Sequence, residues 1–267
     1  MFNGSSRPTG LSATIYLSEP VEDEQANSAA ASAFVQTMQR RVASDVRFVF
    51  PCTGQRLWSN QALLRSASTY FHSLLESEFA EMTMGTTSDV DELEFQHYTF
   101  NDSDAERDIE EDHPRRAEQP RSFLAAGLDV PYAKVRVTDT TYTTYASVLC
   151  WIGTRFVRFA PLKSSKLHPS EVVQPGNAST TTSKTRTLDL PTPASPKSVY
   201  RLAHLLELEA LRALALAIFK SQLTSQNFAH ELYADVASCY PEVRDAAIEF
   251  TVGHWADVAE SDAFKAV

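Results

Sequence analysis

The side chains best suited to metal binding and acid–base catalysis are spread through this sequence without the spacing that such chemistry needs. Its seven histidines include no pair at positions i and i+4, and its three cysteines include no close pair that would complete a zinc site. No serine lies in a Gly-x-Ser-x-Gly turn, and none of the 8 glycines belongs to a phosphate-binding loop. The sequence therefore predicts a non-catalytic protein without a metal or cofactor.

One aromatic side chain, Phe79, lies among glutamates in the stretch "LLESEFAEM" at residues 74–82. An apolar side chain in such polar surroundings has two interpretations. It either closes the end of its own helix over the core, or it is an anchor that a protein partner takes up. The residues alone leave both interpretations open.

Length, charge and cysteine usage narrow the class of protein. With 267 residues, 43% of them hydrophobic, the chain is long enough to bury a core. A net charge of -10 argues against nucleic acid or an anionic membrane as the partner. No apolar run is long enough to span a bilayer, and the N-terminus lacks the order of a signal peptide. Three distant cysteines fit reduced thiols, so we expect a cytoplasmic or nuclear protein.

The elements that would position Phe79 follow from the hydrophobic pattern. Residues 45–59 predict a β-hairpin, and residues 60–81 predict two helices that are broken near Ser68. Upstream, residues 28–42 carry Phe34, Met38 and Val42 at every fourth position, which predicts a short amphipathic helix there. Downstream, we expect a strand, a buried helix and a helical C-terminal region, at residues 133–139, 141–154 and 198–267 respectively.

Polar segments divide the chain into predicted domains. Residues 82–129 are acidic and residues 163–197 are rich in Ser, Thr and Pro. Both have too few apolar residues to order most of their length, so they predict a disordered insertion and a disordered linker. Residues 1–27 predict a flexible N-terminus with one strand at 11–17, which must join a sheet or be the remnant of an upstream domain. The predicted core is then residues 28–162.

The order of these elements, and residues within them, resemble the BTB/POZ domain. Asp45 and Val46 match the opening of the family's first strand. The stretch at 135–154 resembles the family's strand, aspartate and helix, and the stretch at 199–258 resembles its later helices and helical extension. The match covers residues 28–81 and 130–262. Further matches lie in the helix that follows the hairpin, at Leu64, Ser68 and Phe71.

The resemblance implies an α+β fold with a small mixed sheet flanked by helices and an all-helical extension. BTB domains are dimerisation and adaptor modules, in many of which a helix before the first strand packs across the partner subunit. In members that recruit a cullin-RING ubiquitin ligase, a hydrophobic-x-Glu motif follows a helix like the one predicted here. Phe79 and Glu81 fit that cullin-binding motif. The dimer-interface residues implied in the same way are Phe34, Met38, Val42 and Asp45.

Some positions depart from the family pattern. Asn60 replaces a histidine, and Gly153 and Arg155 replace the Tyr and Gly of a Tyr-Thr-Gly motif, which puts the corepressor binding of some family members in doubt. The loop composition is similar to fungal BTB proteins, many of which carry a MATH-like domain, and residues 11–17 would then be its last strand.

The first hypothesis is a homodimeric adaptor that brings a cullin-RING ligase to an unknown protein substrate. A BTB scaffold with no ligase role is the second, and an enzyme is the third.

Overall fold

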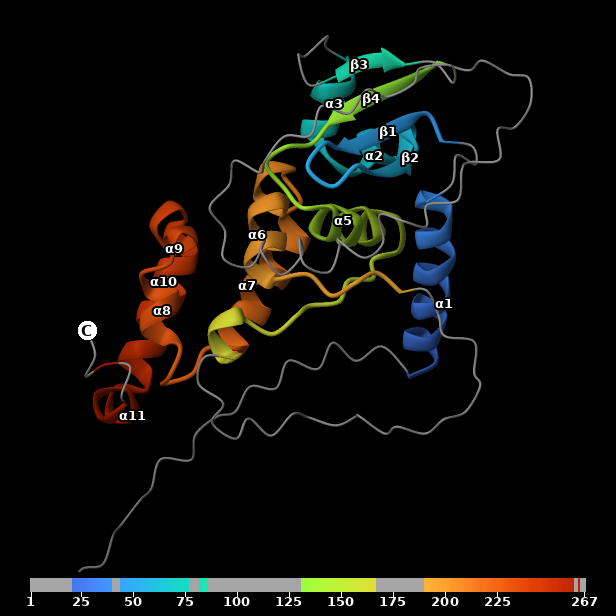
Figure 1. Ribbon diagram of the computed structural model, residues 1–267. Helices are drawn as coiled ribbons and strands as arrows, with labels where there is room; N and C mark the ends of the chain where they lie inside the picture. Colours follow the sequence, from blue (N-terminus) through green and yellow to red (C-terminus); the bar gives the residue numbers. More distant parts are fainter. Residues whose placement is uncertain are drawn as a thin grey trace, which may run out of the picture.

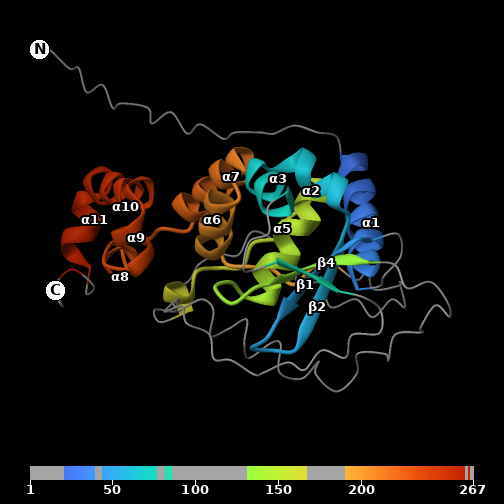
Figure 2. The ribbon, with the colours of Figure 1, turned by 90° about the horizontal axis from the view of Figure 1, so that it is seen from above.

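The computed structural model describes residues 21–39, 44–76, 82–85, 131–166, 190–261 and 264, and these residues form an α+β fold (Figure 1). A four-stranded mixed sheet lies at one end, in the order β2-β1-β4-β3. Helices α2, α3 and α5 share one core with it, and the helices of the C-terminal region extend to one side (Figure 2). The α+β class expected from the sequence is therefore confirmed.

Strand β1 (Val46–Phe50) occupies the middle of the sheet and is buried along its whole length. It pairs antiparallel with β2 (Gln55–Ser59) and parallel with β4 (Tyr132–Arg136). The turn of the β1–β2 hairpin uses Gly54 at φ 72°, a conformation that glycine adopts at no steric cost. The hairpin is the one that the sequence predicted. At the edge of the sheet, β3 (Met82–Gly85) pairs antiparallel with β4.

Helices α2 (Gln61–Ala67) and α3 (Thr69–Glu76) connect the hairpin to the edge strand. The Asn60 side chain caps α2 by accepting hydrogen bonds from two backbone N–H groups of its first turn, at 2.9 and 3.3 Å. The break between the helices falls at Ser68, whose Oγ accepts from the Phe71 N–H at 3.2 Å and so caps α3. The predicted pair of helices is thus confirmed as far as Glu76, together with the residue that separates them, and residues 77–81 lie outside the described residues.

The core lies between the sheet and helix α5 (Tyr142–Thr154). Phe48 and Phe50 of β1 contact Tyr145 of α5, with ring centroids 4.9 and 5.7 Å apart. Phe71 of α3 closes the same layer against Phe48 at 6.0 Å. The buried helix that the sequence predicted here is confirmed, and it is buried on most sides because α1 and α6 also pack against it.

Helix α1 (Val21–Met38) begins seven residues before its predicted start at residue 28. Ala31, Val35 and Met38 form its buried face. Phe34 lies at the margin of that face, and its ring rests directly on Gly153 of α5. A Cβ atom at Gly153 would come within 2.4 Å of two carbons of the Phe34 ring, so glycine permits this close approach.

The C-terminal region is helical, as predicted. It contains α6 (Pro196–Leu205), α7 (Glu209–Ser221), α8 (Phe228–Leu232), α9 (Asp235–Cys239), α10 (Pro241–Gly253) and α11 (Trp255–Glu260). Helices α6 and α7 pack on each other and join the main core, whereas α8 to α11 form the far end of the molecule (Figures 1 and 2). Phe228, Ala229 and Val258 make a small core of their own within that far end.

Of the two segments predicted to be disordered, the first is ordered at its start and the second is ordered at both ends. Met82–Gly85 is strand β3, because its backbone completes the sheet beside β4. Lys163–Lys166 is a 3₁₀ turn, η2, and residues 190–195 lead into α6, with Ala194 bridged to Phe159. The predictions for residues 82–85, 163–166 and 190–197 were therefore wrong. The rest of both segments, and the strand predicted at 11–17, lie outside the described residues.

Candidate functional site

The exposed side of α3 and the neighbouring α6–α7 corner form the candidate interaction surface, which we name the α3 surface. Leu74 and Leu75 point into the core, while the opposite side of the helix faces solvent. The last turn of α3 is held by Arg65, whose guanidinium donates to the Leu75 carbonyl at 2.9 Å. The exposed residues that make up the α3 surface are Thr69, His72, Ser73, Glu76, Leu205 and Glu207.

Two hydrogen bonds fix the start of α3 to the α6–α7 corner. Ser68 Oγ donates to the Leu206 carbonyl at 2.6 Å, and Thr69 Oγ1 donates to the Glu207 carboxylate. Glu207 has a φ of 56°, which is unusual for a residue other than glycine. This left-handed residue ends α6, since the next N–H, that of Leu208, returns to the Ala203 carbonyl at 2.8 Å. The α3 surface is therefore built on two rigidly joined elements.

The predicted cullin-binding residues Phe79 and Glu81 lie outside the described residues. They belong to the five-residue connection, residues 77–81, between the end of α3 at Glu76 and the start of β3 at Met82. The structure describes both of these flanking elements. Along the chain, the two candidates therefore directly follow the α3 surface.

The predicted dimer-interface residues have intrachain contacts of their own. Met38 is 2% exposed and belongs to the core, whereas Phe34 is half-buried and keeps part of its ring accessible. Asp45 Oδ1 accepts from the Gln61 N–H at 2.7 Å, which ties the first strand to the start of α2. Val42 lies outside the described residues. Their role in a dimer stays a prediction.

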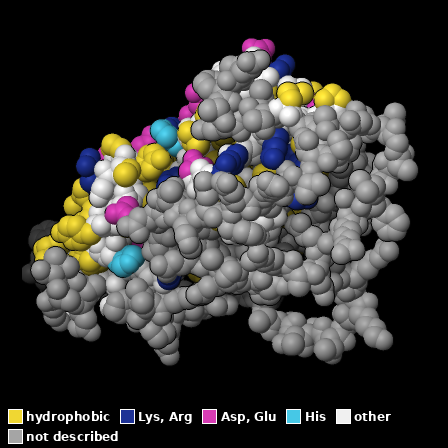
Figure 3. Space-filling model, turned by 45° about the horizontal axis from the view of Figure 1, so that its top comes forward, with side chains coloured by type: hydrophobic (Ala, Val, Ile, Leu, Met, Phe, Trp, Pro, Cys, Tyr) yellow, Lys and Arg dark blue, Asp and Glu magenta, His cyan; other side chains and the backbone are white. Residues whose placement is uncertain are grey.

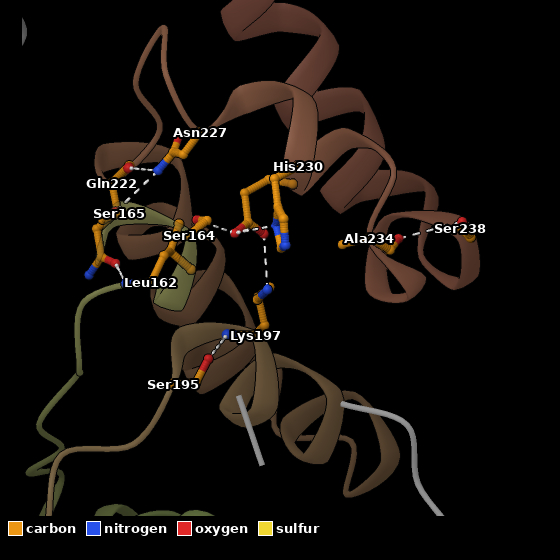
Figure 4. A network of polar contacts seen from close by, with 11 residues as sticks. Leu162, Ser164, Ser165, Ser195, Lys197, Gln222, Asn227, His230, Ala234 and Ser238 are labelled. Atoms are coloured by element: carbon orange, nitrogen blue, oxygen red, sulfur yellow. Dashed lines mark hydrogen bonds and ion pairs between the residues drawn. The ribbon is translucent and has the colours of Figure 1, made fainter. Parts of the chain in front are cut away.

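A buried ion pair joins the core to the C-terminal helices (Figure 4). Lys197, in the first turn of α6, places its Nζ 3.0 Å from Glu231 Oε2 of α8, and both side chains are at most 2% exposed. Ser164 of η2 donates from Oγ to Glu231 Oε1 at 2.5 Å. Three segments that are distant in the sequence thus meet at one carboxylate.

The α7–α8 connection binds the same region through two amide side chains. Gln222 accepts from the Leu162 N–H at 2.8 Å through Oε1, and its Nε2 donates to the Ala160 carbonyl at 3.3 Å. Asn227 donates from Nδ2 to the Gln222 carbonyl at 3.0 Å and to Ser165 Oγ at 3.2 Å. These contacts set the position at which the chain enters α8, and they explain why Asn227 is buried although it is polar.

Sequence reasoning missed the contribution of Lys197, Glu231 and Ser164. It assigned Ser164 and Lys197 to a disordered linker, although one local signal was present. The dipeptide Ser195-Pro196 is typical of a helix start, and Ser195 Oγ does accept from the Lys197 N–H at 3.2 Å.

No protein-family model matches the chain, and no curated protein matches it significantly.

The described part of the chain has neither a metal-binding cluster nor a membrane-spanning helix. No group of three or more His, Cys, Asp or Glu side chains there is arranged to hold a metal ion. No helix among the described residues is long and apolar enough to cross a membrane. All three cysteines are free, and burial raises the pKa of the Cys150 thiol.

An aromatic cluster links α6 to α10. Tyr200 is 2% exposed and donates from its hydroxyl to Glu242 Oε2 at 2.8 Å, and Tyr240 packs edge-on against it with ring centroids 5.4 Å apart. Burial raises the pKa of Tyr200, and the hydrogen bond and charge of Glu242 raise it further. The folded protein therefore keeps the hydroxyl proton of Tyr200 to a higher pH than the unfolded chain does.

Replacing Tyr200 by phenylalanine is expected to lower the free energy of unfolding by about 1–2 kcal/mol at neutral pH, because a hydrogen bond to a carboxylate is lost. As the pH rises above 10.0, the ordinary pKa of tyrosine, the unfolded chain releases this proton while the folded chain keeps it. The wild type should therefore lose stability more steeply there than the variant. Urea unfolding at several pH values measures this, with Tyr233→Phe, at a 70% exposed tyrosine, as the control. Equal slopes in wild type and Tyr200→Phe would contradict the prediction.

Proposed function

We propose that this chain is a protein-interaction module of the BTB/POZ type, which works as a homodimeric adaptor between a cullin-RING ubiquitin ligase and an unknown protein substrate. The observation that carries the proposal is the order of the elements. A hairpin, two helices, the short edge strand β3, a strand parallel to β1, a buried helix and further helices follow one another, and this order supports the proposal. In this role the protein is non-catalytic and acts in the cytoplasm or the nucleus.

The α3 surface supports the cullin part of the proposal. An interaction site is more precise when its side chains project from anchored elements. Phe79 and Glu81 lie in a short connection whose two ends are fixed, by the capped helix α3 and by the pairing of β3 with β4. On the α3 surface the apolar side chain of Leu205 is surrounded by polar ones, which is the usual composition of a small binding hot spot.

Helix α1 supports the dimer part of the proposal. It lies at the outside of the molecule, and its buried face packs on α5 and β2 (Figures 1 and 2). Its outward residues Ala33, Gln36 and Thr37 are exposed, and half-buried Phe34 lies beside them. This exposed side is the part of α1 that a second copy would cover.

The cullin proposal predicts that calorimetric titration with the N-terminal domain of the cullin that serves BTB adaptors detects binding. Replacing Phe79 by alanine should weaken that binding by about 30-fold, since a central apolar anchor contributes about 2 kcal/mol or more. Glu81→Lys should weaken it as well, because the charge at the motif is reversed.

Two matched variants at the far end of the molecule serve as controls. Trp255→Ala removes an exposed aromatic from α11, and Glu260→Lys reverses an exposed charge on the same helix. Both should leave cullin binding unchanged. The ligase role is refuted if the wild type does not bind, or if the Phe79 and Glu81 variants bind as tightly as the wild type. Light scattering tests the dimer separately, and a monomer at tens of micromolar chain would overturn it.

A further inference from the structure

The outer face of the sheet carries a concentration of basic and aromatic side chains. The strand register places Trp58, Arg47 and Lys134 in one row across β2, β1 and β4, and Arg56, Val49 and Arg136 in the next. Residues of one row share a face of the sheet. Because Phe48 and Phe50 point to the core, both of these rows face away from it. We name Arg47, Arg56, Trp58, Tyr132, Lys134 and Arg136 the basic sheet face.

Its positive charges are close together and partly withdrawn from water. Arg47 is only 5% exposed, donates to the Tyr132 hydroxyl at 2.7 Å and lies 5.5 Å from the Trp58 ring centre. Burial lowers the pKa of Arg56, and the positive charge of Arg47 lowers it further. Like charges on neighbouring strands destabilise a sheet, so acidic side chains are the natural complement of this face. Figure 3 shows Lys and Arg side chains close together near the centre of the view, in the region of the sheet.

The chain itself contains a segment of matching charge. Residues 86–130 hold 13 of the 34 acidic residues but only four of the 24 basic ones, so their net charge is -9 out of the total of -10. The remaining 222 of the 267 residues are therefore almost neutral, at -1. Nearly the whole negative excess of the protein is concentrated in this one acidic segment.

Both ends of the acidic segment are attached beside the basic sheet face. Gly85, the last residue of β3, pairs with Tyr132, the first residue of β4. Half of a 45-residue chain can span up to about 70 Å at about 3.3 Å per residue, whereas four strands are only about 14 Å wide. The segment can therefore reach every residue of the face, and tethering gives it a local concentration of about millimolar.

We propose that the basic sheet face is a docking surface whose occupant is the acidic segment of the same chain, residues 86–130. The face supplies four cations and two aromatic rings, and the segment supplies thirteen carboxylates and the aromatic residues Phe95, Tyr98, Phe100 and Phe123. The rings stack and the charges pair, so the interaction has both an electrostatic and an apolar part. This docking does not depend on the cullin or dimer proposals.

Zero-length carbodiimide cross-linking of the full chain, read by peptide mass spectrometry, tests the docking. The reagent joins a lysine amine to a carboxylate that it already touches. Lys134 is the only lysine of the basic sheet face, and we expect it to be joined to carboxylates between Asp89 and Glu118. Lys220 and Glu249, 2.9 Å apart on the exposed surface, provide the internal positive control.

A charge-reversed variant shows whether the face as a whole holds the segment. Arg56→Glu combined with Arg136→Glu leaves Lys134 in place, and it should reduce the Lys134 cross-links by at least about fivefold. The Lys220–Glu249 cross-link should stay unchanged in that variant. Arg244→Glu, at an exposed arginine of α10, is the matched control and should leave both cross-links as in the wild type.

Mixing ¹⁵N-labelled and unlabelled chains before cross-linking identifies whose segment is bound. Cross-links within one isotopic form support the proposal. Mixed-isotope Lys134 cross-links mean that the segment comes from a second copy, and they overturn it. The proposal also fails if Lys134 forms no cross-link to the segment while Lys220 is joined to Glu249, or if the double reversal leaves the Lys134 cross-links unchanged.

Discussion

Replacing Glu231 by leucine is expected to lower the free energy of unfolding by about 3–5 kcal/mol, the usual cost of removing one partner of a buried ion pair. The Lys197 ammonium, 2% exposed, then loses the carboxylate that lies 3.0 Å away. Lys197→Met should be comparably costly, because it leaves the Glu231 carboxylate in the interior without its ammonium. The loss is measured by urea unfolding followed by circular dichroism.

The position of Lys197 in its helix makes the buried ammonium depend still more on the Glu231 carboxylate. It lies in the first turn of α6, where the helix dipole is positive and a cation is disfavoured. Glu231 offsets both this repulsion and the loss of hydration, and it also accepts the hydrogen bond of Ser164. The ion pair with Lys197 and the hydrogen bond from Ser164 therefore hold α8 in one orientation relative to α6 and η2.

The double variant Lys197→Met/Glu231→Leu separates pairing from packing. Two apolar side chains of similar volume should recover most of the stability that either single change removes. Lys220→Met and Glu249→Leu form the matched control, because the same kind of pair lies there on the exposed surface and should cost less than about 1 kcal/mol to break. If Glu231→Leu is no more harmful than Glu249→Leu, the buried pair does not stabilise the fold.

Elements with strong local patterns were predictable from the sequence. The alternation of "VRFVF" and "QRLWS" around a turn with glycine is sufficient to indicate the β1–β2 hairpin, and Ser68 marks the break between α2 and α3. Strand β3 was missed for a physical reason. Its four residues, Met-Thr-Met-Gly, include no valine, isoleucine or aromatic residue, and the strand forms by pairing with the edge of β4.

The junction at Glu231 could not be predicted, because its partners are distant in the sequence. Ser164 precedes Glu231 by 67 residues, and only the packed fold brings them together. A serine and a lysine within a polar stretch are normally solvated, so composition assigned them to a linker. Charge patterning alone does not distinguish a buried pair from a surface one.

The buried face of α1 was predicted only in part. The pattern gave weight to the large residues Phe34 and Met38, whereas the helix buries Ala31 and Val35 together with Met38. Small Ala31 lets the helix approach α5 closely, and Gly153 takes up the ring of Phe34. Close helix packing is set by small residues, to which a hydrophobic pattern gives little weight.

Replacing Met38 by alanine is expected to lower the free energy of unfolding by about 2–5 kcal/mol, the range for removing a buried side chain of this size. Met38 is 2% exposed within its own chain, so this loss should arise from the core. The dissociation constant of the proposed dimer should stay unchanged. Unfolding curves give the first quantity, and sedimentation equilibrium gives the second.

Phe34→Asp is the informative counterpart, because Phe34 lies at the margin of the same helix face and keeps part of its ring exposed. In the proposed dimer it should weaken association by at least about tenfold, since a charge is brought into an apolar contact. Trp255→Ala, at an exposed aromatic residue of α11 away from α1, is the control and should leave association unchanged. If Met38→Ala weakens the dimer as strongly as Phe34→Asp, then Met38 contacts the partner subunit. Helix α1 would in that case be held by the partner subunit and not by α5 of its own chain.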